Sequence, residues 1–429
     1  MRILFLTFFF PPYNTIGAVR TGTTAKYLVE LGHDVRVISA YPQALTDDLE
    51  LEIPRHQVTY TKWLARRSLK RVSPAASAVG KDAADGRRLA AMAKKLYWEL
   101  MIPDQQLGWF PFALQAARSA IKENDVDVIL ASGSPLTSLL VGRSASRYGD
   151  LPWVAELRDA WMDHAYRPHF LFRDYLERPL ERRTLADADG LVTVTAPLAA
   201  ALETTYRRPV EVVYNGYEPG EASLPHSPDT DRLVIRYTGS MYDEKRVPHG
   251  LFRCLRALDP AALPICVEFY GADLGHVERA AAAAGVRDAV RCFGSVRRTE
   301  SLRLQRDADV LLLASTPVER DGLTGKLFEY MNARRPVLLV GCPDGEAADL
   351  VRSAGCGFVA DDLSQLKAQL ETWRAAKATG GRIPDGPRPP QRFTRLEQTR
   401  VLAGFLETVV RQRSLRRGHR ATRHPVTHG

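Results

Sequence analysis

Residues 310–340 read VLLLASTPVERDGLTGKLFEYMNARRPVLLV, and this stretch decides the fold class. It opens and closes with the apolar runs Val310–Ala314 and Val337–Val340, which are typical of strands buried on both faces of a sheet. Between them, Lys326–Asn332 has the periodicity of a helix. A strand, a helix and a second strand in this order predict two parallel strands, because parallel neighbours need a crossover connection.

The same alternation extends through the chain in both directions. Further strands are predicted at Arg2–Thr7, Val35–Ser39, Val126–Ala131, Trp153–Glu156, Leu191–Thr195, Val210–Tyr214, Leu233–Tyr237, Cys266–Tyr270, Val290–Phe293 and Gly357–Ala360. Further helical patterns lie at Val19–Leu31, Pro248–Leu258 and Glu300–Arg306. The sequence therefore predicts the α/β class, with two doubly wound Rossmann-like domains facing a central cleft.

Two breaks in the alternation mark the domain boundaries of this 429-residue chain. Residues 216–231 are dense in Gly, Pro, Ser and Asp, and residues 380–390 are dense in Gly and Pro. After the second break, Thr394-Arg-Leu-Glu397 is a capping box that starts a last helix. These signals predict a first domain over 1–216, a second over 232–380, a helix over 395–411 that packs back on the first domain, and a basic tail over 412–429.

Composition narrows the class of protein. Hydrophobic residues make up 45% and charged residues 25% of the chain, which is typical of a globular protein. Apolar runs are too short for a membrane-spanning helix, which needs about 18 residues or more. The five cysteines are odd in number and form no CxxC pair, which argues against a disulfide scaffold or zinc ribbon and favours the reducing cytoplasm.

Positive charge is concentrated in two segments. The net charge is +9, but residues 60–100 alone hold ten Lys/Arg and three acids, and residues 411–429 hold six Arg and no acid. Within the first segment, an apolar stripe at helical spacing has basic flanks: Leu89, Met92, Ala93, Leu96, Tyr97 and Leu100, beside Arg87, Arg88, Lys94 and Lys95. This pattern predicts peripheral docking on an anionic membrane surface. The alternative is a helix packed on its own domain. Nucleic acid is disfavoured, because no aromatic residues interleave with the tail arginines.

The richest candidate site is the loop and helix start within the opening stretch. Thr324 and Gly325 follow a strand and expose backbone N–H groups at a helix N-terminus, where Lys326 adds positive charge. The Glu329 carboxylate can accept two hydrogen bonds from a vicinal diol such as that of ribose. A Walker A loop is excluded, because Leu327 stands where Ser or Thr is required. The alternative is an ordinary capped helix.

Phosphate-binding features follow the first strand of each domain. Gly239 at a strand end precedes the adjacent cations Lys245 and Arg246, which suit a diphosphate, although a solvated pair would look the same. No GxGxxG follows Arg2–Thr7, but Gly17 begins a helix and lets its N–H groups approach an anion.

Two further groups of charged residues are candidate sites. Arg158, Asp159, Asp163 and His164 crowd a strand end of the first domain, as catalytic or acceptor-binding groups do; the alternative is an Arg–Asp pair holding a loop. Three DxD triplets, Asp125–Asp127, Asp187–Asp189 and Asp307–Asp309, each directly precede an apolar strand. We interpret them as turn residues and predict no metal site.

Taken together, these motifs resemble the family 4 retaining glycosyltransferases of the GT-B fold, and in particular a subgroup of exopolysaccharide and antigen biosynthesis. The resemblance rests on Phe9–Pro12 with Gly17 and Arg20, on residues 31–35 and 213–216, on Gly239 with Lys245/Arg246, and most specifically on Leu323–Tyr330 followed by Arg335–Val337. It implies transfer from a nucleoside diphosphate sugar on the second domain to a glycan, lipid-linked or small-molecule acceptor on the first. It also implies retention of configuration and no metal cofactor.

The resemblance also assigns roles to residues. The family's Glu-x7-Glu motif falls on Asp321 and Glu329, and the Asp leaves the identity of the donor sugar open. Ser240 replaces the arginine usual after the glycine, so phosphate contact rests on Lys245 or Arg246, with Lys326 and the N–H groups near Gly17 and Gly325. Asp159 or His164 takes the place of the family's histidine. The catalytic set implied is Asp159, His164, Asp321 and Glu329.

Two other functions stay open at this point. A sugar-nucleotide epimerase on the same fold would need acids and bases around the sugar but no separate acceptor. A sugar-nucleotide-binding scaffold at the membrane would bind without turnover. For the transferase, the expected location is the cytoplasm, peripherally on the inner face of the cell membrane.

Overall fold

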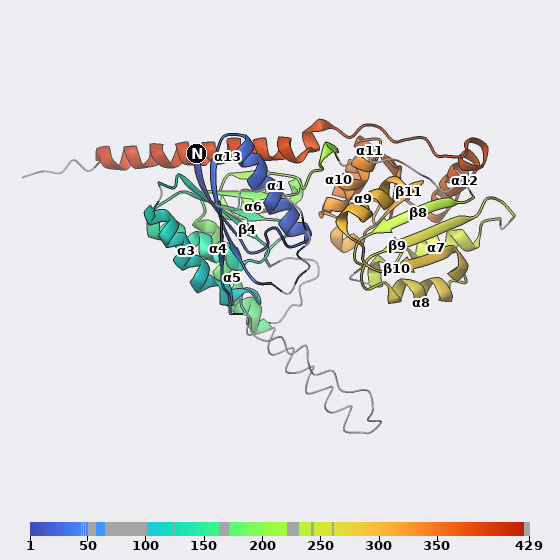
Figure 1. Cartoon of the computed structure of the whole chain (residues 1–429), viewed down its shortest axis with the longest axis horizontal. Coiled ribbons are helices and arrows are strands. Elements are labelled where there is room, and N and C mark those ends of the chain that lie inside the picture. Colours follow the sequence, from blue (N-terminus) through green and yellow to red (C-terminus); the bar gives the residue numbers. More distant parts are fainter. Residues whose placement is uncertain are drawn as a thin grey trace, which may run out of the picture. The chain divides into compact units, whose positions relative to one another are not determined.

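A computed structural model describes residues 1–43, 45, 47, 49, 57–64, 101–123, 125–162, 171–220, 231–241, 244–259 and 261–423. The chain divides into two compact units (Figure 1). The N-terminal unit contains Met1–Val213 and, from the other end of the chain, Thr399–Gly429. The C-terminal unit contains Tyr214–Gln398.

The N-terminal unit is built on a parallel sheet of seven strands in the order β3-β2-β1-β4-β5-β6-β7. The strands are β1 (Arg2–Thr7), β2 (Asp34–Ala40), β3 (Val58–Thr61), β4 (Val128–Gly133), β5 (Trp153–Leu157), β6 (Gly190–Thr193) and β7 (Val210–Val212). The chain starts in the middle, adds strands on one side and then returns to the other side. This order is the doubly wound arrangement that the sequence predicts, with the switch point between β1 and β4.

Helices cover both faces of this sheet. They are α1 (Ile16–Glu30), α3 (Phe110–Glu123), α4 (Thr137–Gly149), α5 (Leu171–Ala186), α6 (Ala196–Tyr206) and the later part of α13 (Arg395–Arg423). Because side chains alternate along β1, Ile3 and Phe5 pack with α1 and α13 on one face, and Leu4 and Leu6 pack with α3 and α4 on the other. The apolar runs of the sequence are therefore buried on both sides.

Helix α13 is longer than the sequence predicts. Its start is capped by Thr394, whose Oγ1 accepts from the Glu397 N–H at 3.3 Å, and it buries an apolar stripe including Phe405 and Val409 against the sheet. The helix then continues to Arg423, although residues from 412 on were predicted as a tail. The helix therefore has 29 residues instead of the predicted 17, and its arginines give the reason.

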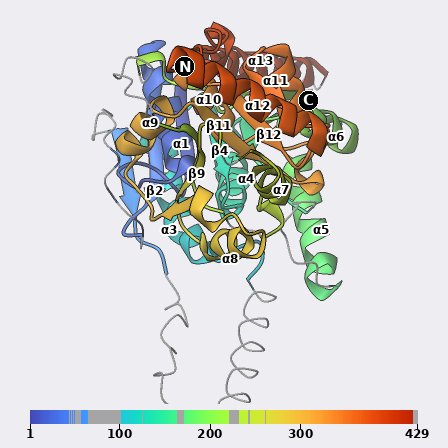
Figure 2. The same ribbon diagram turned by 90° about the vertical axis from the view of Figure 1, so that its right-hand side faces the viewer.

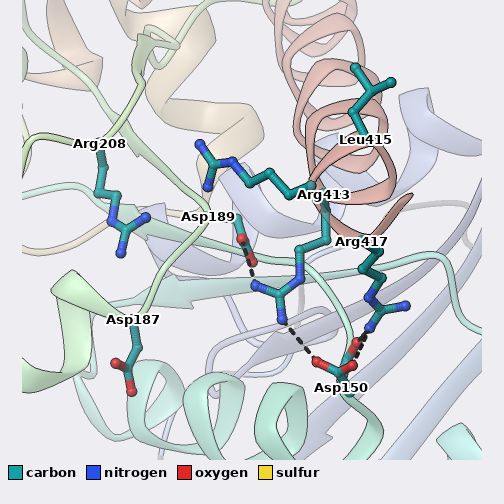
Figure 3. Close-up of a pocket in the computed structure, with 8 residues that line it drawn as sticks. Asp150, Asp187, Asp189, Arg208, Arg413, Leu415 and Arg417 are labelled. Carbon is teal, nitrogen blue, oxygen red and sulfur yellow. Dashed lines mark hydrogen bonds and ion pairs between the residues drawn. The ribbon is translucent and has the colours of Figure 1, made fainter. Parts of the chain in front are cut away.

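Two of these arginines find carboxylate partners on the N-terminal unit. Arg413 contacts Asp150 at 2.9 Å and Asp189 at 3.1 Å, and Arg417 contacts Asp150 at 2.7 Å (Figure 3). The pairs border an open cavity of about 630 Å³, which Arg208 and Leu415 also line. Ion pairing over two further turns extends the helix beyond its apolar stripe.

The C-terminal unit repeats the architecture with six parallel strands in the order β10-β9-β8-β11-β12-β13. These are β8 (Leu233–Thr238), β9 (Ile265–Tyr270), β10 (Val290–Phe293), β11 (Val310–Ala314), β12 (Val337–Val340) and β13 (Gly357–Val359). β11 and β12 pair in parallel, with Leu311 opposite Val337, as the opening stretch of the sequence predicts.

Helices again cover both faces of the second sheet. They are α7 (His249–Arg256), α8 (Gly275–Ala283), α9 (Arg298–Arg306), α10 (Gly325–Ala333), α11 (Glu346–Ser353) and α12 (Leu363–Gly380). Helices α7, α8 and α12 pack on one face, and α10 and α11 on the other (Figures 1 and 2). Consequently, α10 begins at the carboxyl-end edge of the sheet, just beyond β11.

The DxD triplets are turn residues that hold the sheets together. Asp125 and Asp127 pair with Arg2, at 2.9 and 3.1 Å. In the third triplet, Asp309 accepts from the Val234 N–H at 2.9 Å and contacts Lys377 of α12 at 2.7 Å. Within the described ranges, no three His, Cys, Asp or Glu side chains gather closely enough to hold a metal ion.

The Lys377–Asp309 pair gives a stability prediction, since side-chain exposure is 0% for Lys377 and 1% for Asp309. Lys377→Met leaves a buried carboxylate without its cation and is expected to cost about 3–5 kcal/mol of unfolding free energy. Lys367→Met is the matched control, because Lys367 forms an exposed pair with Glu371 on the same helix and is expected to cost at most about 1 kcal/mol. Urea denaturation measures both, and equal losses would contradict the prediction.

Candidate functional site

The start of α10 lies at the carboxyl-end edge of the C-terminal sheet. Thr324 is its N-cap, with Oγ1 accepting from the Lys326 N–H at 3.4 Å, and Gly325 is the first helical residue. The sequence predicts this helix from Lys326, one residue later. The first-turn N–H groups of a helix have no partners within the helix, so this end of α10 attracts anions.

Lys326 and Gly239 lie together at the end of β8. The Lys326 ammonium is 3.8 Å from the centre of the Tyr237 ring, which holds it by a cation–π contact. Gly239 has φ +121°, and a Cβ there would lie 2.8 Å from Lys326 Nζ. Glycine is therefore required both by the backbone conformation and by the approach of the ammonium. The structure thus unites two of the residues predicted to hold phosphate.

Glu329 lies one turn further along α10 and is largely buried. Its Oε1 is 2.6 Å from Arg298 Nη1, and its Oε2 is 3.4 Å from Gln305 Nε2. Burial raises the pKa of this carboxyl, but Arg298, Arg395 and the hydrogen bond from Gln305 together outweigh burial, so the pKa lies below its usual range. Glu329 is therefore a carboxylate near neutral pH and can accept hydrogen bonds from hydroxyl groups.

The remaining predicted residues of the C-terminal unit lie in the loops after β8 and β11. Arg246 forms an ion pair with Glu319, which joins the two loops, while Lys245 is exposed. Asp321 is also exposed, and its charge contributes to a raised pKa of Glu346 at the start of α11, after burial and Asp349. The structure places Asp321 outside the network around Glu329.

A second cluster of charge lies at the carboxyl ends of β4 and β5 in the N-terminal unit. The buried pair Arg20–Glu156 has an N–O distance of 2.7 Å, and Ser132 also donates to Glu156. Burial raises the pKa of Glu156, but Arg20 and the Ser132 hydroxyl together hold it below its usual range. The sequence named Arg20 only as part of the family resemblance. In the structure, its guanidinium is paired with the buried Glu156 carboxylate.

Arg158 lies beside the N-terminus of α1. Its Nε and Nη2 donate to the carbonyl oxygens of Gly133 and Ser134, at 2.8 and 2.5 Å. A Cβ at Gly17 would lie 2.7 Å from Arg158 Nη1, so only glycine lets the guanidinium come this close to the helix end. Two positive groups, a cation and a helix N-terminus, therefore meet at one place, which favours an anionic ligand.

The predicted acceptor-side residues are placed only in part. Asp159 is exposed in the loop after β5, next to Arg158. His164 lies outside the described residues. Sequence reasoning did not select Arg298 or Gln305, and it named Arg158 only among crowded residues. Their position in the sequence could have pointed to both arginines. Arg158 directly follows strand β5, and Arg298 is the first residue of the helix that follows strand β10.

Family comparisons identify both halves of the chain. Residues 17–221 match the model described as Glycosyltransferase Family 4, and residues 232–373 match the model described as Glycosyl transferases group 1. The chain belongs to the GT-B glycosyltransferases. In this glycosyltransferase, the Lys326 and Glu329 sites lie in the group 1 match and the Arg158 site in the family 4 match.

Solved structures of the same fold include one in complex with UDP and with UDP-glucose. HepE of Anabaena, in complex with UDP, has a TM-score of 0.55 at 16% identity, over 98% of this chain and 100% of that chain. Sucrose-phosphate synthase of Thermosynechococcus elongatus has a TM-score of 0.60 at 13% identity, over 98% and 100%. A putative UDP-N-acetylglucosamine 2-epimerase of Listeria monocytogenes has a TM-score of 0.51 at 12% identity, over 94% and 95%. These likenesses confirm the predicted fold.

Three further findings concern curated sequences, membrane-spanning helices and the cysteines. No curated protein sequence matches this glycosyltransferase. Among the described helices, none combines the length and the apolar character needed to cross a membrane. The five cysteines carry free thiols, and four of them are buried.

Proposed function

We propose that this glycosyltransferase transfers a sugar from a uridine diphosphate sugar to a glycan or lipid-linked acceptor, with retention of configuration and without a metal ion. The observation that carries the proposal is the site on α10. There, an ammonium at the end of β8 and an ionised, buried carboxylate one turn away suit the diphosphate and the ribose of one nucleotide. The bound UDP and UDP-glucose of HepE structures support uridine as the base.

Different residues of the C-terminal unit bind different parts of the donor. Glu329 accepts hydrogen bonds from the ribose diol, and Lys326 with the Gly325 N–H group binds the diphosphate. As the glycosidic bond breaks, negative charge develops on the leaving diphosphate, and these donors stabilise it without rearranging. Arg246 or Lys245, in the loop after β8, adds a further cation.

The N-terminal unit supplies the acceptor side. Asp159 and His164 are the candidates for orienting or deprotonating an acceptor hydroxyl, since both follow β5 in the sequence and Asp159 lies in the loop directly after it. Arg158 and the Gly17 N–H group form an anion-binding corner there. That corner suits a phosphate of the leaving group or of a lipid-linked acceptor.

The proposal is tested by incubating the purified protein with UDP sugars, with and without glycan and lipid acceptors. Transfer predicts UDP release that depends on an acceptor. A change in the sugar without any acceptor would instead indicate an epimerase. Tight binding without UDP release under any condition would indicate a scaffold.

Metal independence is a separate expectation. Because each DxD triplet has an Asp paired with a basic side chain, EDTA is expected to leave the rate of UDP release nearly unchanged. The measurement is the initial rate before and after chelation, with Mg²⁺ or Mn²⁺ added back. Loss of activity on chelation and its recovery with one of these ions would overturn the expectation.

Peripheral membrane binding is the remaining part of the proposal. Residues 87–100 lie outside the described residues, and pairing of Arg413 and Arg417 removes part of the tail's charge, while Arg411 and Arg416 stay exposed. We expect the protein to sediment with acidic liposomes and to be released by salt. Neutralising Arg87, Arg88, Lys94 and Lys95 together should weaken sedimentation. Equal binding to neutral liposomes would point to a soluble acceptor.

A further inference from the structure

Helix α9 presents two side chains to the Glu329 carboxylate, one for each oxygen. Arg298, the first residue of α9, lies 2.6 Å from Oε1, and Gln305, two turns later on the same face, lies 3.4 Å from Oε2. Gln305 also donates to Thr238 Oγ1 at 3.1 Å, which ties the amide to the end of β8. The side chains of Arg298 and Glu329 are 18% and 10% exposed, so little water competes with this pair.

These contacts restrict the orientation of the carboxylate. A glutamate carboxyl group ordinarily rotates about its last torsion with little preference. With its two oxygens held from the same helix, Glu329 has one favoured orientation. Each carboxylate oxygen has about two lone-pair sites, so one site on each oxygen is left for a ligand hydroxyl. Two adjacent hydroxyls of a ribose match that arrangement.

The same contacts keep Glu329 charged. Burial raises its pKa, and the charged groups that act against burial are Arg298 on α9 and Arg395 at the start of α13, helped by the hydrogen bond from Gln305. Tyr330 on α10 is a buried neighbour whose own pKa lies above its usual range, mainly through burial, so it stays neutral. Arg298 is the strongest of the opposing influences.

We propose that Arg298 is the positioning residue for donor recognition: by fixing the charged Glu329 carboxylate, it sets the preference of the site for a ribose over a 2′-deoxyribose nucleotide. Arg298 acts through Glu329 and does not touch the reacting atoms. This inference rests on the proposed nucleotide-sugar donor and adds the residue that makes its ribose site selective. The role also gives a reason for the close approach of Arg298 to Glu329, a contact that the sequence alone does not reveal.

The test compares the binding of UDP-glucose and 2′-deoxy-UDP-glucose by calorimetry in Arg298→Gln, Arg298→Lys and the wild type. Arg303→Gln is the matched control, because Arg303 lies on the same helix and pairs with Glu300 at an exposed position. The wild type is expected to prefer the ribose donor by about tenfold or more, since one charge-assisted hydrogen bond is at stake. In Arg298→Gln this preference should fall towards one, and Arg303→Gln should keep it.

The pH dependence provides a readout that a purely structural role would not change. The phosphates of UDP-glucose stay ionised between about pH 5.5 and 8, so a change in affinity reports on the protein. Wild-type affinity should be flat over this range. In Arg298→Gln, burial is no longer opposed by Arg298, so Glu329 takes up a proton as pH falls and affinity should decrease. Arg298→Lys keeps the charge but changes the geometry, so its affinity should stay flat while its ribose preference drops.

The outcomes distinguish a failure of the positioning role of Arg298 from a failure of the proposed function. An Arg298→Gln protein with wild-type ribose preference and a flat pH profile would overturn the positioning role. If this variant does not fold, an unchanged ribose preference in Arg298→Lys would overturn it equally. A wild-type protein that binds neither nucleotide sugar would defeat the proposed function, and the inference with it.

Discussion

Replacing Glu329 by Ala is expected to reduce kcat/KM by about 10²–10⁴-fold, because two charge-assisted hydrogen bonds to a diol contribute together about 3–6 kcal/mol. The loss should appear in donor binding as well as in turnover, since the carboxylate grips the ribose in both. Steady-state kinetics of UDP release, with the donor concentration varied, measure the effect.

Controls for this prediction come from the same unit. Glu329→Gln keeps the shape of the side chain and should lose nearly as much activity, because the charge is what the hydroxyl groups and Arg298 recognise. Glu300→Gln is the matched control, since Glu300 pairs with Arg303 at an exposed position. It should keep full activity. A Glu329→Ala enzyme that folds and turns over at the wild-type rate would remove the ribose role.

Replacing Lys326 by Met is expected to weaken UDP binding by about 10- to 100-fold, since a hydrogen bond from a charged donor to phosphate contributes about 1.5–3 kcal/mol. Uridine, which lacks the phosphates, should bind the variant and the wild type with similar affinity. Methionine keeps an unbranched apolar stem in place of that of lysine, so the fold should be little affected. Calorimetric titration with UDP and with uridine measures the difference.

The double variant of Lys245 and Arg246 serves as a comparison for Lys326. The sequence predicts a phosphate role for one of this pair, whereas the structure engages Arg246 with Glu319. A phosphate-specific loss in the double variant would indicate that Lys245, or Arg246 released from Glu319, contacts the phosphates. Equal losses for UDP and uridine in Lys326→Met would argue against a diphosphate at the end of β8.

Most strands of the fold were predicted well because they are short apolar runs, and the central ones, such as β4 and β5, are buried on both faces. The exception is β3, Val58–Thr61, which was missed. Its residues are exposed or half-buried at the edge of the sheet, so no continuous apolar run reveals it. The end of α13 was predicted too early. Beyond its apolar stripe, the helix forms ion pairs with Asp150 and Asp189, which lie far away in the sequence.

The candidate site was predictable only where one segment carries it. Thr324, Gly325, Lys326 and Glu329 stand within six residues, and strand–loop–helix reasoning finds them together. Arg298 lies 31 residues before Glu329, and only tertiary structure brings it to 2.6 Å. Likewise, the closeness of Arg158 to Gly17 depends on the neighbouring order of β1, β4 and β5. Spacing along the chain carries no such information.

The central claim is that the carboxyl-end edge of the C-terminal sheet binds a nucleoside diphosphate sugar. The most direct measurement is the unfolding temperature of the wild-type protein with and without a panel of nucleotide sugars. A donor at about 100 times its Kd stabilises the protein by about 2.7 kcal/mol. We predict an upward shift with a uridine diphosphate sugar that disappears in Glu329→Ala. No shift with any nucleotide sugar, or an equal shift in Glu329→Ala, would contradict the account.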